Sequence, residues 1–255
     1  MHTWHWQTWE GLPYLTCNLL EPWQHGFFTQ QYSPRPPHEL VPVLQPTAEV
    51  YRVKQVHGNT VLATGVAGKS PDLMDADGLV TEAANQAVWV CSADCTPVLI
   101  ADATTGQVAA LHAGWRGTAA KIVPLAIAHL QTQGSHLKDL RIALGPAIAG
   151  SVYQVGVEVA VKLGATLVSA SSPEAMLEAL YRLPDSPIAA DPEPNRVRLD
   201  VRRVIALQLE GLGIEVEQVA IAPHCTYQQP EHFFSYRRDG KKQVQWSGIV
   251  SSNRQ

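Results

Sequence analysis

Residues 107–117, with the sequence QVAALHAGWRG, join an apolar run to a glycine-rich turn. The apolar run ends at His112 and has the composition of a buried strand. From Gly117 to Gln133, apolar residues recur at helical spacing, with Pro124 inside the segment. Because proline disrupts a helix interior, we expect a kink or a helix start near Pro124. This stretch therefore predicts a strand that carries His112 to its end, followed by a helix.

Similar patterns on both sides of this stretch predict further strands and helices. We expect strands at 50–56, 87–91, 97–100, 140–144, 216–222 and 243–250. We expect helices at 155–163, 173–183 and 201–210. Two proline-rich stretches, 33–46 and 184–194, predict loops, and the tryptophan-rich N-terminus predicts an edge strand. Several strands precede the first clear helix, an order that favours an α+β fold over a regular doubly wound one.

The composition is that of a globular protein and argues against several function classes. Hydrophobic residues make up 45% of the 255 residues and charged residues 16%, so we do not expect a disordered chain. The small net charge of −4 and the lack of a dense basic tract argue against a nucleic-acid partner. No apolar run approaches the ~18 residues of a membrane span, and the N-terminus lacks the pattern of a secretory signal. The sparse cysteines indicate reduced thiols, so we expect a soluble cytoplasmic protein.

Three reactive side chains are expected at strand ends: His57, Cys95 and His112, with a glycine close to each histidine. Neighbouring strands lie ~4.8 Å apart, so three strand ends can bring these side chains around one metal ion. One cysteine and two histidines form the three-ligand set of a catalytic zinc site, which keeps a fourth position open for water. The spacing alone leaves a second interpretation open, because single cysteines and histidines are often core residues. Cys91, within an apolar run, is interpreted as a core residue.

At these residues the sequence resembles the laccase-domain family, also called multicopper polyphenol oxidases or peptidoglycan-editing-factor proteins and described as purine nucleoside phosphorylases. The matching segments follow the family's order over nearly the whole chain: 23–29, 54–58, 76–81, 92–98, 112–117, 145–148, 153–155 and 233–240. The resemblance implies one domain spanning residues 1–255, with mixed sheets flanked by helices, distantly similar to toxin-type cysteine deamidases. It also implies that His57, Cys95 and His112 bind a metal ion.

The resemblance implies an enzyme that acts on purine nucleosides. The implied reactions are phosphorolysis of adenosine, inosine, guanosine and methylthioadenosine, and hydrolytic deamination of adenosine. For deamination we expect water activated by zinc to attack C6 of adenine, and a carboxylate, Asp77 or Asp94, to move the protons. Each carboxylate also suits an ordinary turn residue. Copper is the weaker alternative for the metal, and the sequence does not determine the preferred purine or the oligomeric state.

Phosphorolysis also requires a place for the phosphate anion. Arginine suits phosphate geometry, and Arg116 precedes a predicted helix start, whose N–H groups also favour anions. Arg237 and Arg238 share a loop with Tyr236 and Phe234, whose rings we expect to stack on a purine. For each arginine, an ordinary surface or packing ion pair is the alternative interpretation.

Three segments depart from the family pattern. Residues 30–35 replace a stretch rich in glycine and serine, so we expect a different loop on the substrate side. Val152 stands where the family often has a cysteine, so that thiol is not needed for chemistry in this chain. Residues 241–245 replace a Thr-Gly-Arg step, and Lys241 or Lys242 is the candidate substitute for its arginine.

Four other functions are compatible with the same residues. A metal-free hydrolase would use Cys95 as nucleophile and His57 or His112 as base. A copper polyphenol oxidase would need many more ligands than these three. A cell-wall editing enzyme would remove wrong amino acids from a muramyl precursor. A zinc-stabilised binding module would need a fourth ligand, for which Cys225 or His224 is the candidate.

Overall fold

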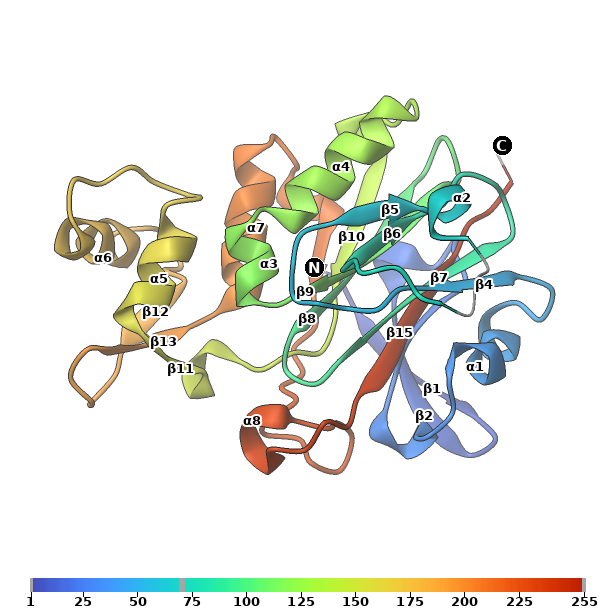
Figure 1. Ribbon diagram of the computed structural model, residues 1–255, viewed down its shortest axis with the longest axis horizontal. Helices are drawn as coiled ribbons and strands as arrows, with labels where there is room; N and C mark the ends of the chain where they lie inside the picture. Colours follow the sequence, from blue (N-terminus) through green and yellow to red (C-terminus); the bar gives the residue numbers. More distant parts are fainter. Residues whose placement is uncertain (1, 69–71, 254–255) are drawn as a thin grey trace.

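Two six-stranded mixed sheets form the body of the protein (Figure 1). The computed structural model describes residues 2–68 and 72–253. The first sheet has the order β1 (Trp4–Trp9), β2 (Leu12–Cys17), β3 (His25–Phe28), β15 (Gln245–Val250), β7 (Gln86–Ser92) and β4 (Glu49–Arg52). The second has the order β14 (Val219–Ile221), β10 (Leu140–Leu144), β8 (Thr96–Asp102), β9 (Val108–Ala113), β6 (Gly78–Val80) and β5 (Val61–Ala63). Each sheet contains parallel and antiparallel pairs.

Helices cover the outer face of each large sheet. The first sheet is covered by α1 (Pro37–Leu44), and the second by α3 (Trp115–Ala119), α4 (Ile122–Thr132) and α7 (Val201–Gly211). A lobe at the left of Figure 1 contains β11 (Gln154–Gly156), β13 (Arg196–Leu199), β12 (Ile188–Ala190), α5 (Val157–Gly164) and α6 (Pro173–Tyr181). Two single-turn helices, α2 (Thr64–Ala67) and α8 (Tyr236–Asp239), lie in connections. No helix of the described residues is long and apolar enough to cross a membrane.

Alternation along the central strands divides the core into layers. In β9, Val108 and Ala110 belong to the cluster between the two large sheets, whereas Ala109 and Leu111 pack toward the helices. Because successive strand side chains point to opposite faces, His112 shares the face of Val108 and Ala110. The alternation therefore directs His112 toward the space between the sheets.

The predicted α+β fold of mixed sheets with flanking helices is confirmed, but several predicted elements differ. The predicted loop at 33–46 contains α1, which has Pro37 at its first position, where proline is tolerated. Pro42 lies inside this helix, and burial of Leu40 and Leu44 against the first sheet stabilises the helix in spite of it. The predicted helix from 117 to 133 divides into α3 and α4 at Lys121, whose φ is 58°. Pro124 is the third residue of α4, where its missing N–H costs no helical bond.

Strand boundaries also differ from the prediction. The predicted strand at 50–56 ends at Arg52, and the first part of the predicted strand at 216–222 is a 3-10 turn before β14. The predicted loop at 184–194 contains β12, and β13 was not predicted. The tryptophan-rich N-terminus does form an edge strand, β1. The misplaced elements are short, and tertiary pairing rather than local sequence determines them.

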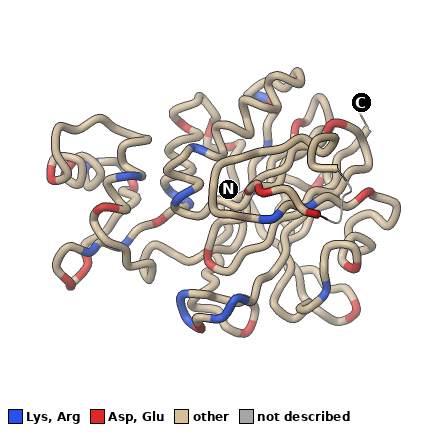
Figure 2. The backbone as a smooth tube through the Cα atoms, viewed as in Figure 1, with Lys and Arg blue, Asp and Glu red and all other residues tan. Residues whose placement is uncertain are grey.

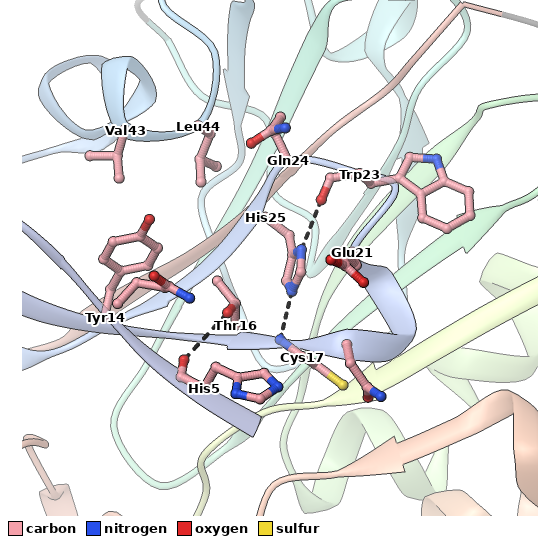
Figure 3. A pocket seen from close by; sticks show the side chains of 12 residues that line it. His5, Tyr14, Thr16, Cys17, Glu21, Trp23, Gln24, His25, Val43 and Leu44 are labelled. Atoms are coloured by element: carbon pink, nitrogen blue, oxygen red, sulfur yellow. Dashed lines mark hydrogen bonds between the residues drawn. The ribbon is translucent and has the colours of Figure 1, made fainter. Parts of the chain in front are cut away.

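His25 joins the first sheet to the segment before it, beside a hollow of about 220 Å³ (Figure 3). Its Nδ1–H donates to the Trp23 carbonyl at 2.8 Å, and its Nε2 accepts from the Cys17 N–H at 2.9 Å. Only the second bond requires the neutral ring, because a protonated Nε2 cannot accept. Burial lowers the pKa of His25 to about 4, although the bond to Trp23 opposes this shift. The hollow shares no residue with the His57, Cys95 and His112 group.

We expect His25 to make folding sensitive to acid. The unfolded chain, with an ordinary histidine pKa, binds a proton that the folded state excludes between about pH 4 and 6.5. The contribution of His25 to the free energy of unfolding is therefore fully present above pH 6.5 and decreases by about 3 kcal/mol as the pH falls to 4. Urea unfolding at pH 7 and pH 4.5 should show a weaker pH dependence for His25→Gln than for the wild type. The exposed control His38→Gln should follow the wild type, and identical pH dependence in all three proteins would contradict this account.

Candidate functional site

The three candidate ligands meet where the chain passes from one large sheet to the other. β7 ends at Ser92 in the first sheet and β8 begins at Thr96 in the second, so Cys95 lies in the turn between them. The loop that carries His57 likewise joins β4 of the first sheet to β5 of the second. His112 is the penultimate residue of β9. The expected neighbouring strand ends supply Cys95 and His112, because β8 and β9 pair with Thr96 opposite Ala113, whereas His57 comes from the connection between the two sheets.

The side-chain atoms of His57, Cys95 and His112 form a compact cluster. Their potential ligand atoms lie within 4.8 Å of one another, and the two imidazole centroids are 4.8 Å apart at an interplanar angle of 83°. Zinc binds sulfur at about 2.3 Å and imidazole nitrogen at about 2.0–2.1 Å, so small side-chain shifts would let one ion reach all three atoms. His112 is buried, Cys95 half-buried and His57 exposed, so the cluster opens to solvent beside His57.

Asp77, fully buried, holds two of these residues in place. Its Oδ1 accepts from the His57 backbone N–H at 2.9 Å and lies 2.8 Å from His112 Nδ1. Its Oδ2 accepts from the backbone N–H groups of Gly58, at 2.6 Å, and Val56, at 3.2 Å. A carboxylate only accepts, so the imidazole donates from Nδ1 and leaves Nε2 free for a metal or the thiolate.

These bonds favour a positioning role for Asp77 over the predicted proton transfer. Burial raises the pKa of Asp77, but the bonds from His112 and Gly58 outweigh burial and hold the pKa below its ordinary value. The carboxylate is therefore charged, with both oxygens occupied and no exposed surface. Carboxylates in this position orient a metal-binding histidine and raise its basicity.

Cys95 has the electrostatics of a thiolate. Burial raises its pKa, but hydrogen bonds with His112 and His57 outweigh burial and lower the pKa to about 7. Burial lowers the pKa of His112, but Asp77 and Cys95 outweigh burial and raise it to about 9. At Cys91, by contrast, burial raises the pKa to about 11. Of these two thiols, Cys95 is the one prepared to bind a metal or to act as a nucleophile.

Two glycines of the turn after β9 permit the close approach of these segments. A Cβ on Gly114 would lie 2.8 Å from the Cys95 sulfur and 3.7 Å from His57 Cδ2. A Cβ on Gly117 would lie 2.7 Å from the Gly58 carbonyl oxygen, which is backbone and cannot move aside. The turn therefore needs glycine at both positions for steric reasons.

Asp94 fastens the Cys95 turn to distant parts of the chain. Its Oδ1 accepts from the Thr226 hydroxyl at 2.7 Å, and its Oδ2 accepts from the Arg237 backbone N–H at 2.7 Å. Its carbonyl accepts from the Ile148 N–H at 3.0 Å. Its φ of 90° lies in the left-handed region, which aspartate tolerates better than most residues. These contacts also favour positioning over the predicted proton transfer.

The arginines predicted to bind substrate have different environments. Arg116 is exposed, with its guanidinium 4.4 Å from the Trp115 ring centroid. Arg238 is used within its own loop, where its partners are the carbonyls of Thr226, Tyr227 and Phe233 and the carboxylate of Asp239. Arg237 is exposed, so it is the member of the pair that remains accessible. Figure 2 shows the positive charge gathered around α8.

Three aromatic residues near the arginines, Tyr236, Phe234 and Tyr153, differ in exposure and in contacts. Tyr236 is 57% exposed and Phe234 half-buried, and within the described residues no hydrogen bond or ring contact joins either to the His–Cys–His cluster. Tyr153 begins the matching segment 153–155, and the sequence predicts no role for it, although the Arg237 guanidinium lies 4.8 Å from its ring centroid. An aromatic residue within a matched loop was the available signal for Tyr153.

The proposed fourth ligands of a closed structural site are engaged elsewhere. Cys225 Sγ accepts from the Ala149 N–H at 3.2 Å, and His224 Nδ1 pairs with Gln229 at 3.1 Å. In the part of the chain that the structure describes, the only group of three or more potential ligands is the His57, Cys95 and His112 cluster. Three ligands leave a position open, which is typical of catalytic rather than structural zinc.

Comparison with known proteins identifies the family. A family model described as multi-copper polyphenol oxidoreductase laccase matches residues 38–251. The chain belongs to this family. Two crystal structures share its fold: YlmD from Geobacillus stearothermophilus has a TM-score of 0.79 and 23% identity, covering 97% of this chain and 99% of that one. The hypothetical protein YfiH from Bacillus licheniformis has a TM-score of 0.75 and 24% identity, covering 94% and 96%.

Relatives in this family have names that refer to purine nucleosides. A purine nucleoside phosphorylase from Synechocystis sp. is 51% identical over 256 residues, covering 97% of each chain. A purine nucleoside phosphorylase from Haemophilus influenzae is 30% identical, covering 73% of this chain and 68% of its own. A protein named adenosine deaminase RL5, from an unknown prokaryotic organism, is 30% identical, covering 64% of this chain and 57% of its own. These names support an enzyme of this kind.

We expect Asp77→Asn to weaken metal binding about 10- to 100-fold, the range typical of residues that orient a ligand. The amide would turn an NH₂ group toward N–H donors and cease to fix the His112 tautomer. Competition with a chelator, with Zn²⁺ as the probe, measures the affinity. The control is Asp75→Asn, because the Asp75 carboxylate is exposed and pairs with Lys54, at 3.0 Å, on the surface. Equal zinc affinity in both variants would show that Asp77 does not contribute to metal binding.

Proposed function

We propose that the chain is a zinc-dependent purine nucleoside enzyme with two reactions at one site. The reactions are phosphorolysis of adenosine, inosine, guanosine and methylthioadenosine, and hydrolytic deamination of adenosine. The observation that carries the proposal is the His57, Cys95 and His112 cluster, compact, open on one side and backed by a charged Asp77. The names of the relatives supply the substrate class.

The donor set fits zinc. A thiolate and two imidazole nitrogens are ligands that zinc accepts, and the low pKa of Cys95 supplies the thiolate near neutral pH. Copper accepts similar ligands, but multicopper oxidation needs several metal sites, and the described residues contain a single cluster. In a three-ligand site, zinc lowers the pKa of a bound water toward ~7 and so supplies a nucleophile. The four free cysteines support a reducing compartment such as the cytoplasm.

The surrounding residues have separate tasks in this proposal. Asp77 and Asp94 hold the segments that carry the ligands in place. Gly114 and Gly117 leave room for these segments to approach closely. Arg116 and Arg237 supply fixed positive charge for phosphate, whose planar oxygen sets match a guanidinium. Tyr236 is exposed and available to stack on a purine ring.

One specific observation favours a second candidate, a metal-free hydrolase. The lowered pKa of Cys95 and its contact with two histidines also describe an activated cysteine nucleophile. This enzyme would keep its activity after zinc is removed, whereas the zinc enzyme would lose it.

The test is adenosine turnover with and without phosphate, together with the zinc content of each protein. For the wild type we expect about one zinc per chain, adenine and ribose 1-phosphate with phosphate, and inosine and ammonia without it. Cys95→Ser should lose bound zinc and at least about a hundredfold in both rates, because the ligand set is broken. Cys91→Ser, four residues away, should keep both. Zinc-loaded wild type that converts no purine nucleoside would refute the proposal, and full activity without zinc would favour the hydrolase.

A further inference from the structure

Tyr153 and Arg237 form a stacked pair from distant parts of the chain. The Arg237 guanidinium carbon lies 4.8 Å from the centroid of the Tyr153 ring. Tyr153 directly precedes β11, whereas Arg237 lies in α8. A guanidinium over an aromatic ring is attracted by the negative ring face, so the ring restricts where the charge can lie.

Two hydrogen bonds restrict Arg237 further. Its Nη1 donates to the Gln154 carbonyl at 2.8 Å, and its backbone N–H donates to Asp94 Oδ2 at 2.7 Å. Its Nε and Nη2 groups have no partner among residues 2–68 and 72–253. Arg237 is thus an immobilised guanidinium with free donors, whereas the N–H groups of Arg238 are used by its own loop.

The stacked pair lies beside the His57, Cys95 and His112 cluster. Asp94, which binds the Arg237 backbone, is the residue immediately before Cys95. Burial raises the pKa of Tyr153 to about 12, with Cys95 adding to the rise and Arg237 opposing it. Arg116 also opposes the rise, so the Tyr153 phenol lies within electrostatic range of Cys95 and of both guanidinium groups.

We propose that Tyr153 is a positioning residue that holds the Arg237 guanidinium where it can donate hydrogen bonds to phosphate. Tyr153 thereby sets the balance between phosphorolysis and deamination. This inference rests on the proposed function. In phosphorolysis a phosphate oxygen bonds to ribose C1′, the bond from C1′ to purine N9 breaks, and N9 takes the electron pair and a proton. In deamination water adds at C6 and ammonia leaves, so no phosphate takes part. A residue that positions Arg237 therefore affects the first reaction more than the second.

The ring of Tyr153, rather than its hydroxyl, performs this task. No hydrogen bond joins the hydroxyl to another residue of the described ranges, whereas the ring face contacts the guanidinium. Phenylalanine preserves the face, and leucine removes it at similar bulk. These two variants separate stacking from every contribution of the hydroxyl.

The experiment measures the phosphate KM of phosphorolysis and the rate of phosphate-free deamination in the same preparations. For Tyr153→Leu we expect a phosphate KM about tenfold higher, in line with the strength of a cation–π contact, and a ratio of phosphorolysis to deamination that falls by a similar factor at subsaturating phosphate. Tyr153→Phe should restore both values to near those of the wild type. Tyr181→Leu, a partly exposed tyrosine on α6, is the unrelated control. Thermal unfolding confirms that each variant is folded.

Three results would overturn the inference. These are an equal loss of both reactions in Tyr153→Leu, an unchanged phosphate KM, and a phenylalanine variant that behaves like leucine. If the wild type performs neither reaction, the proposed function fails first. Calorimetric titration of inorganic phosphate then decides the inference separately, because equal phosphate affinity in the wild type and Tyr153→Leu would overturn it and a weaker affinity in the variant would support it.

Discussion

The structure depends on one buried carboxylate between two sheets. Asp77 accepts bonds from consecutive backbone N–H groups of the His57 loop and from the His112 ring, so it ties the connection between β4 and β5 to the end of β9. An isolated buried carboxylate is unfavourable, and this one is stabilised because every oxygen has donors. The same bonds that make its burial possible also orient the imidazole. Fold stability and site geometry therefore have a common cause.

A second carboxylate, Asp94, connects the Cys95 turn to distant parts of the chain. Asp94 stands beside Cys95 and binds both Thr226 and the Arg237 backbone, so the position of α8 is tied to the position of the thiolate. The Arg237 cation and the Cys95 thiolate are then held in a fixed relation by the protein itself. Such preorganisation is valuable in catalysis because it avoids the cost of ordering groups during the reaction.

The sequence predicted which side chains gather at the site better than it predicted how the sheets bring them together. His57, Cys95 and His112 were identified mainly through the family resemblance, because single cysteines and histidines are often core residues. The passage of the chain between two sheets depends on pairings that local patterns do not encode. Asp77 and Asp94 were recognised as important but assigned to proton transfer, since their bonding partners are remote or in the backbone. Tyr153 received no role because its partner lies in α8, far along the chain.

The central claim is that His57, Cys95 and His112 hold one catalytic zinc ion. X-ray diffraction at the zinc absorption edge, on crystals of protein purified without added metal or chelator, tests it most directly. The account predicts one anomalous peak about 2.3 Å from the Cys95 sulfur and about 2.0–2.1 Å from a nitrogen of each histidine, with a fourth position left to solvent. A well-ordered site with no peak, or with a protein side chain as fourth ligand, would contradict it.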